Sequence, residues 1–121
     1  VNTYNQIINY LKNFGEVLTE FIGDTSLSSL GEGELNDKFI HDRDMEWLLS
    51  ADVLVAEVTT PSLGVGYEIG RALENGKQIL CLYRNIDGKR ISAMVKGASG
   101  ISAKQYNDLE EAKGLLEEFF N

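Results

Sequence analysis

Two acidic residues stand where a globular protein usually places apolar ones, and both have the chemistry to take part in bond cleavage. Glu68 lies in the stretch TTPSLGVGYEIGRALENG, four residues after Gly64. On a helix, the residue four positions earlier borders the space above a side chain, so Gly64 leaves room there for a ligand. Asp44 lies four residues after Ile40 and three before Trp47, in the middle of an apolar helical face. A carboxylate in such surroundings needs a partner or a purpose.

Both carboxylates also have structural explanations, which stay open at this point. Glu68 can be a boundary residue paired with Arg71, and Asp44 can bond Arg43 or a backbone amide, or its helix can begin later. Neither is accompanied by other metal-ligand types, so the pair favours glycosidic-bond chemistry over metal chemistry. In that chemistry Glu68 suits the nucleophile and Asp44 the assisting group. No metal and no cofactor is implied.

The glycine pattern around Glu68 does not fit either common phosphate loop. Gly64, Gly66 and Gly70 are spaced G-x-G-x-x-x-G, which is one residue longer than the dinucleotide fingerprint, and no Walker lysine follows. A carboxylate beside a pyrophosphate would also repel it. The pattern therefore argues against a dinucleotide or nucleoside triphosphate cradle.

The composition predicts one ordinary globular domain over residues 1–121, with 43% hydrophobic and 25% charged residues. A formal net charge of -8 without a run of Lys or Arg argues against binding to a nucleic-acid polymer, so a small anion would be held by local donors. No apolar run approaches the ~20 residues of a membrane helix, and signal-peptide features are lacking, so we expect no membrane partner and a cytoplasmic location. Cys81, in the apolar run QILCLY, is expected to be a small buried residue.

The elements that must position these residues alternate along the chain. Strands are predicted at 16–22, 52–58, 78–84 and 101–106. Helices are predicted at 3–13, at about 35–50, within the glycine stretch up to Asn75-Gly76, at 92–98, and after a capping pair of Asn107 and Glu110. Residues 23–34 form a loop that is a lid or a mobile connection. This alternation predicts a doubly wound, Rossmann-like or flavodoxin-like parallel sheet with helices on both faces and a ligand crevice at the carboxyl ends of its strands.

The run DMEWLLSADVLVAEVTTPSLGVGYEIGRALENGKQILCLYR resembles the 2'-deoxynucleoside 5'-monophosphate N-glycosidases, which are relatives of the nucleoside 2-deoxyribosyltransferases. ISAMVKGA is a second specific match, and the likeness extends from Tyr4 to the C-terminal helix. The resemblance implies that the glutamate of GYE, Glu68, is a nucleophile that forms a covalent deoxyribosyl intermediate. It also implies that Asp44 is the family's catalytic aspartate.

The resemblance separates two branches of this family by one residue. Six residues before the nucleophile the transferases place an aspartate and the monophosphate hydrolases a serine, and this chain has Ser62. An aspartate would repel a phosphate dianion, whereas a serine hydroxyl and helix amides donate to it. Ser92, in ISAM, matches a second phosphate-contacting serine, which in the family comes across a dimer interface. The resemblance therefore implies a homodimer in which Ser92 reaches the neighbouring site.

The sequence departs from the family at its beginning. Family members start with a strand ending in a Gly-Ser turn, which carries a catalytic tyrosine and part of the phosphate loop, and this chain begins where the first helix should. We therefore predict roughly 10–15 further residues upstream, enough for one strand and its loop. Neither Tyr4 nor Tyr67 is assigned the role of the missing tyrosine.

Together these features predict hydrolysis of the N-glycosidic bond of 2'-deoxynucleoside 5'-monophosphates to free base and 2-deoxyribose 5-phosphate. Glu68 attacks C1', Asp44 orients the substrate and manages protons, and Ser62, Gly64 and Ser92 hold the phosphate. Two alternatives stay open. One is a transferase that moves deoxyribose between bases, and the other is a noncatalytic nucleotide-binding module on the same fold.

Overall fold

The computed structural model describes residues 3–18, 36–86 and 90–121, which belong to two compact units, Val1–Ser50 and Ala51–Asn121. The placement of the two units relative to one another is not determined, so the prediction of a single domain over 1–121 stays a prediction.

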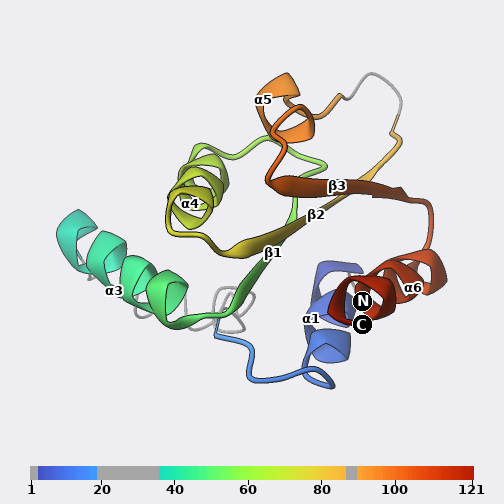
Figure 1. The fold of residues 1–121 in the computed structure, drawn as a ribbon, viewed down its shortest axis with the longest axis horizontal. Helices are drawn as coiled ribbons and strands as arrows, with labels where there is room; N and C mark the ends of the chain where they lie inside the picture. The colour runs from blue at the N-terminus through green and yellow to red at the C-terminus, as the bar shows by residue number, and fades with distance from the viewer. Residues whose placement is uncertain (1–2, 19–35, 87–89) are drawn as a thin grey trace. The chain divides into compact units, whose positions relative to one another are not determined.

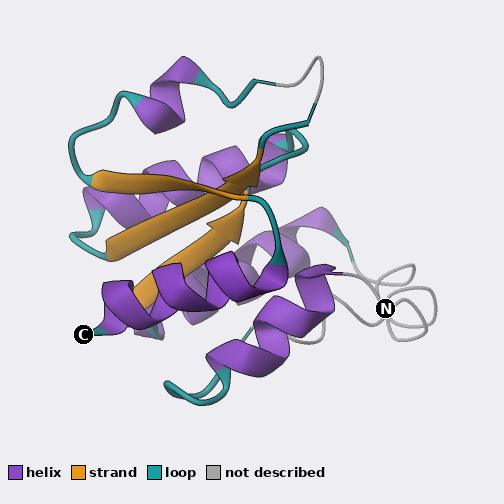
Figure 2. Ribbon diagram, turned by 90° about the vertical axis from the view of Figure 1, so that its right-hand side faces the viewer, coloured by secondary structure: helices purple, strands orange, loops and turns teal. Residues whose placement is uncertain are grey.

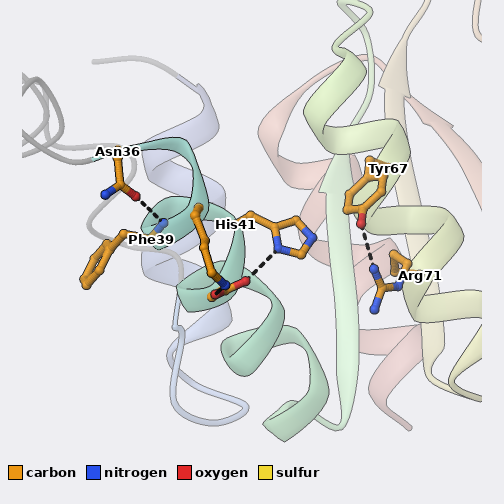
Figure 3. A network of polar contacts seen from close by, with 7 residues as sticks. Asn36, Phe39, His41, Tyr67 and Arg71 are labelled. Atoms are coloured by element: carbon orange, nitrogen blue, oxygen red, sulfur yellow. Dashed lines mark hydrogen bonds and ion pairs between the residues drawn. The ribbon is translucent and has the colours of Figure 1, made fainter.

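The first unit contains two described helices, α1 (Thr3–Leu11) and α3 (Asp37–Ser50). Both are predicted from the sequence and confirmed. In α1 the side chains of Ile7 and Ile8 are buried. Helix α3 begins after Asn36, whose side-chain oxygen accepts a hydrogen bond from the Phe39 N–H at 2.8 Å (Figure 3). This bond satisfies one of the backbone donors that the first turn of a helix leaves without a partner.

The second unit is a parallel sheet with its helices. Its elements in chain order are β1 (Val53–Glu57), α4 (Leu63–Glu74), β2 (Gln78–Arg84), α5 (Ala93–Lys96), β3 (Ile101–Tyr106) and α6 (Leu109–Phe120). The strand order is β1-β2-β3, and both pairings are parallel, with Val53 opposite Gln78 and Ile79 opposite Ile101. The middle strand is the most deeply buried, as expected for a strand that is covered on both faces.

Helices cover both faces of this sheet. Helix α4 packs against β1 and β2, α6 packs against β3, and Figures 1 and 2 place α4 and α6 on opposite faces. Ile69 and Ala72 of α4 and Ala112 and Leu116 of α6 are each at most 3% exposed. A parallel sheet flanked in this way confirms the predicted doubly wound class. Because the strands are parallel, their carboxyl ends lie at the same end of the sheet, with Glu57, Arg84 and Tyr106 as their last residues. The loop from β1 to α4 starts there.

The predicted strand at 16–22 is not present in its described part. Residues 16–18 carry no strand pairing, and the described sheet runs from β1 to β3 without them. A strand persists only where its backbone groups pair with a neighbour. Residues 19–22 and the predicted loop 23–34 lie outside the described residues.

The predicted cap of the last helix is wrong by one residue. Asp108, and not Asn107, caps α6, because its side chain accepts a hydrogen bond from the Glu111 N–H at 2.9 Å. The Glu111 carboxylate in turn accepts the Asn107 N–H at 2.7 Å. The sequence NDLEE offers two registers of the same capping motif, and the periodicity of the following helix does not choose between them.

One large apolar residue near the end of α4 lies at the surface. Ile69 and Ala72 are buried, but Leu73 is 38% exposed, and its side chain covers Gly100, where a Cβ atom would overlap it. The helix ends at Glu74 and is closed by Asn75 and Gly76 as predicted, with Asn75 as the C-cap and Gly76 at a φ of 73°. That left-handed backbone is the ordinary stop for a helix and favours glycine.

The buried cysteine also fits its prediction. Cys81 is 0% exposed, and burial raises the pKa of its thiol to about 11, so the reactive thiolate is scarce near neutral pH. Across the described ranges, no helix is both long and apolar enough to cross a membrane. Within those same ranges, no cluster of three His, Cys, Asp or Glu side chains is arranged to hold a metal ion.

Candidate active site

The first turn of α4 is prepared for an anion by its capping serine. Ser62 has extended backbone angles, and its hydroxyl oxygen accepts a hydrogen bond from the Val65 N–H at 3.3 Å. Ser62 is exposed, and accepting this bond leaves its O–H to donate outward. The helix dipole and the remaining backbone N–H groups of the first turn favour a negative charge at the same place.

Gly64 and Glu68 follow on one face of the same helix. Among the described residues, and apart from its chain neighbours and the backbone of its own helix, a Cβ atom built at Gly64 would meet the Ser62 hydroxyl oxygen alone, at 4.0 Å, so the space between the cap and the next turn is open there. Glu68 lies one turn later and is partly buried. Helical side chains generally lean toward the N-terminus of their helix, so we expect Glu68 to face this space. Ser62, Gly64 and Glu68 follow one another over the cap and the first half of α4.

Arg71, which the sequence offers as a partner of Glu68, is engaged by a tyrosine. Its guanidinium donates to the Tyr67 hydroxyl at 2.7 Å and lies 5.6 Å from the centroid of the same ring (Figure 3). The pair stands at i and i+4 on α4, where side chains one turn apart meet. Tyr67 is about half exposed.

Ser92 plays the same local role at the start of α5. Its hydroxyl oxygen accepts a hydrogen bond from the Met94 N–H at 3.1 Å, and its carbonyl accepts the Val95 and Lys96 N–H groups. Ser92 is exposed, so its O–H is also available to an external acceptor. It begins a different helix from Ser62, and its predicted arrival at a neighbouring site stays a prediction.

Asp44 is compensated by its neighbour in sequence. Its Oδ1 accepts from the Nε and Nη2 atoms of Arg43, both at 3.1 Å, and the guanidinium of Arg43 lies 4.9 Å from the Trp47 ring centroid. The Asp44 side chain is 21% exposed, so it is partly buried, as Ile40 and Trp47 of the same face are. The buried residues of α3 are Met45 and Leu48. Asp44 belongs to the first unit and Glu68 to the second, so their convergence on one sugar carbon stays a prediction.

His41 has the surface role that a lone histidine on a charged helix face usually has. It is exposed, and its Nδ1 lies 3.0 Å from the Asp42 carboxylate (Figure 3). Asp42 also binds Lys38, and the two donors lower the pKa of the Asp42 carboxyl, with Lys38 as the larger cause.

A polar cluster at the carboxyl edge of the sheet is absent from the sequence-based prediction. Glu57, the last residue of β1, accepts hydrogen bonds from Thr59 and from the hydroxyl of Tyr106. Burial, and then the bond to Glu57, raise the pKa of the Tyr106 hydroxyl far above its ordinary value, while Arg84 acts in the opposite direction. The sequence feature that indicates this cluster is Glu57, a carboxylate inside the apolar run DVLVAEV.

Comparison with known proteins places the chain among nucleotide-processing enzymes. The family model described as nucleoside 2-deoxyribosyltransferase matches residues 1–116. A protein of Esox lucius named 5-hydroxymethyl-dUMP N-hydrolase is 54% identical in an alignment 121 residues long that covers 97% of this chain and 83% of that protein. A Homo sapiens protein of the same name is 48% identical over 120 residues, covering 97% of this chain and 69% of that protein. A solved structure of a Clostridium botulinum CMP N-glycosidase aligns with a TM-score of 0.72 at 20% identity over 97% of this chain and 88% of that chain, and this likeness concerns the fold alone.

Proposed function

We propose a reaction for this chain from one premise: the chain belongs to the nucleoside 2-deoxyribosyltransferase family. The reaction is hydrolysis of the N-glycosidic bond of a 2'-deoxynucleoside 5'-monophosphate, which yields the free base and 2-deoxyribose 5-phosphate. The names of the similar Esox lucius and Homo sapiens proteins support this reaction and a deoxynucleotide substrate. Phosphorylated substrates do not cross membranes unaided, and we place the reaction in the cytoplasm for that reason.

The observation that carries the proposal is the order of groups at the start of α4. A serine cap with an outward O–H, an open space at Gly64 and a partly buried carboxylate at Glu68 follow one another along a single helix. Ser62 and Glu68 are six residues apart, about 9 Å along the helix axis, and the N-terminal lean of Glu68 shortens that gap. A nucleotide whose phosphate is bound at the cap would then have its sugar beside the carboxylate of Glu68.

The chemistry follows from these positions. A Glu68 carboxylate oxygen attacks C1', the bond from C1' to the base nitrogen breaks, and the base leaves with a proton from an acidic group. Water then attacks C1' of the glutamyl ester, so the sugar gains a hydroxyl and Glu68 is regenerated. The second proton of that water returns to the acid, and the sum of both steps is the addition of one water molecule. Asp44 is the proposed proton carrier, which gives a proton to the leaving base and regains one from the water, and Arg43 would hold its carboxyl group in position.

The residue at position 62 favours a monophosphate substrate over an unphosphorylated nucleoside. A hydroxyl donates to a phosphate dianion, whereas a carboxylate at the same cap would repel it. This difference supports hydrolysis of nucleotides rather than transfer of deoxyribose between bases.

A homodimer is part of the proposal, with Ser92 of one protomer contacting the phosphate in the site of its neighbour. Two exposed apolar side chains support such an interface, because each stands beside one of the phosphate-binding serines. Leu63 follows Ser62 and is 96% exposed, and Met94 lies two residues after Ser92 and is 84% exposed. Apolar side chains with this exposure are common in surfaces that associate.

The test of the proposed function is base release by the Glu68→Ala variant. The wild-type chain is incubated with each deoxynucleoside monophosphate, and free base is separated and measured. We expect Glu68→Ala to lower the rate by about a thousandfold or more, as loss of a nucleophile does, while calorimetry shows that it still binds the substrate. Turnover that survives this substitution refutes the assignment of the nucleophile, and a wild-type chain that releases no base refutes the reaction.

A further inference from the structure

One carboxylate in the second unit accepts three hydrogen bonds and has no part in the mechanism above. Glu57, at the end of β1, accepts the Thr59 N–H at 2.8 Å on one oxygen. Its other oxygen accepts the Thr59 hydroxyl at 2.7 Å and the hydroxyl of Tyr106. Thr59 is 9% exposed, Tyr106 is 1% exposed and Glu57 is half-buried, so these bonds are largely shielded from water. Hydrogen bonds to a charged acceptor in such a place are among the stronger ones.

The same threonine also connects β2, the neighbouring strand, to this cluster. The Thr59 hydroxyl donates its proton to Glu57 and accepts the Arg84 N–H at 2.9 Å. Glu57, Arg84 and Tyr106 are the last residues of β1, β2 and β3. The carboxyl ends of all three strands are therefore joined through two residues: Glu57 binds Tyr106 of β3, and Thr59, the second residue after β1, binds Glu57 and Arg84 of β2.

Thr59 begins the short loop that leads to α4. Three residues later Ser62 caps that helix, and the only proline of the chain, Pro61, stands directly before the cap. Proline fixes its own φ and restricts the residue before it, so few rotations remain between Thr59 and Ser62. The direction in which the loop leaves Thr59 therefore determines where the Ser62 hydroxyl points.

We propose that Glu57 is a positioning residue for phosphate binding: by holding the backbone and hydroxyl of Thr59, it aims the Ser62 hydroxyl and the first turn of α4 at the substrate phosphate. The proposal rests on the proposed function of this site. Glu57 touches neither the substrate nor the reacting atoms, and it acts through Thr59. The rival explanation is that Glu57 only stabilises the edge of the sheet, and the two explanations differ in what a substitution changes.

The central variant is Glu57→Gln, which keeps the shape of the side chain. A glutamine has one acceptor oxygen and one NH2 donor, so one of the donors that face Glu57 meets another donor. We expect the KM for deoxynucleoside 5'-monophosphates to rise about tenfold, the equivalent of one lost hydrogen bond to a charged group, while kcat stays within about twofold. A purely structural role lowers the folded fraction and leaves the KM of the folded enzyme unchanged.

A matched control is available at the start of α6. Glu111 accepts a backbone N–H from Asn107 at 2.7 Å, so Glu111→Gln makes the same chemical change at a loop that has no part in the proposed site. We expect its KM and kcat to remain within about twofold of wild type. At Thr59 the conservative Thr59→Ser variant keeps the hydroxyl and should keep the KM, whereas Thr59→Val should raise it as Glu57→Gln does.

Amide hydrogen exchange gives a readout that does not depend on activity. In Glu57→Gln the Thr59 N–H should exchange at least about tenfold faster than in wild type, with the amides of β3 unchanged. The proposal is overturned if the KM of Glu57→Gln equals that of Glu111→Gln, or if exchange accelerates equally across all three strands. If the wild-type chain releases no base, the proposed reaction fails separately, and calorimetric binding of 2-deoxyribose 5-phosphate takes the place of KM in the same comparison.

Discussion

The alkaline stability of the second unit depends on one tyrosine, and Tyr106→Phe tests this directly. At neutral pH the variant loses a hydrogen bond from a buried hydroxyl to the Glu57 carboxylate, while the two bonds from Thr59 remain. Bonds to charged groups contribute about 1.5–3 kcal/mol, and because Glu57 keeps two donors we expect the lower end, about 1.5 kcal/mol. For a chain of this length that loss lowers Tm by roughly 5 °C.

The pH dependence carries the sharper prediction. Burial and the bond to Glu57 hold the pKa of Tyr106 above its ordinary value of 10.0 in the folded protein. In the unfolded chain the same hydroxyl ionises near pH 10, so above that pH the unfolded state binds fewer protons than the folded state. Stability therefore falls with rising pH by about 1.4 kcal/mol per unit, and at pH 11 wild type has lost about 1.4 kcal/mol that Tyr106→Phe cannot lose. The two stability curves should differ at pH 8 and meet near pH 11.

The assay is denaturant unfolding followed by far-UV circular dichroism between pH 7 and 11. Fluorescence is unsuitable because the only tryptophan, Trp47, lies on α3 in the first unit. Every other titrating group is shared by the two proteins, so the difference between their curves isolates Tyr106. Curves that remain parallel from pH 8 to pH 11 would show that the folded protein does not hold Tyr106 in its neutral form, and the argument for the Glu57 cluster would lose its electrostatic basis.

Two further predictions concern the phosphate. In Ser62→Asp the new carboxylate caps α4 as well as serine does, so stability should be kept while the KM for deoxynucleoside monophosphates rises about tenfold or more through charge repulsion. An unchanged ratio of kcat/KM between phosphorylated and unphosphorylated substrates would contradict this. If Ser92 serves the neighbouring site, mixing Ser92→Ala with Glu68→Ala protomers should restore about a quarter of wild-type activity, because random pairing makes half the molecules heterodimers with one intact site of two. No recovery after mixing and re-association would place Ser92 in the site of its own chain.

The second unit is the part of the fold that its sequence predicts best. The strands at 78–84 and 101–106 were expected with the bounds they have. The strand at 78–84 is the clearest, because a central parallel strand is buried on both faces and appears as an unbroken apolar run. Helix ends were harder to predict. The cap of α6 lies one residue later than predicted, because Asn107 and Asp108 are both good capping residues and each has a glutamate three positions later.

Of the candidate site, the sequence predicts the groups on α4 and misses the cluster that orients them. Ser62, Gly64 and Glu68 share one short helix, so their spacing determines their relation. For Asp44, spacing predicted a carboxylate in the middle of an apolar face, and the structure shows a partly buried side chain that binds Arg43. The sequence offered this pairing as an alternative, because the partner is the adjacent residue.

Asp44 and Glu57 give the same sequence signal, a carboxylate within an apolar pattern, and they differ in where their compensation comes from. The partner of Asp44 is one residue away, so a local pattern contains it. Glu57 accepts a hydrogen bond from Tyr106, which lies 49 residues later in the chain. Thr59, which also binds Glu57, accepts the backbone N–H of Arg84, 25 residues after that threonine. Only the register of the parallel strands brings these groups together. The remote partners also join three strands to one loop, so removing the carboxylate of Glu57 should disturb the geometry of a site. Removing the carboxylate of Asp44 should instead leave the sheet in place and act on the proposed proton transfer.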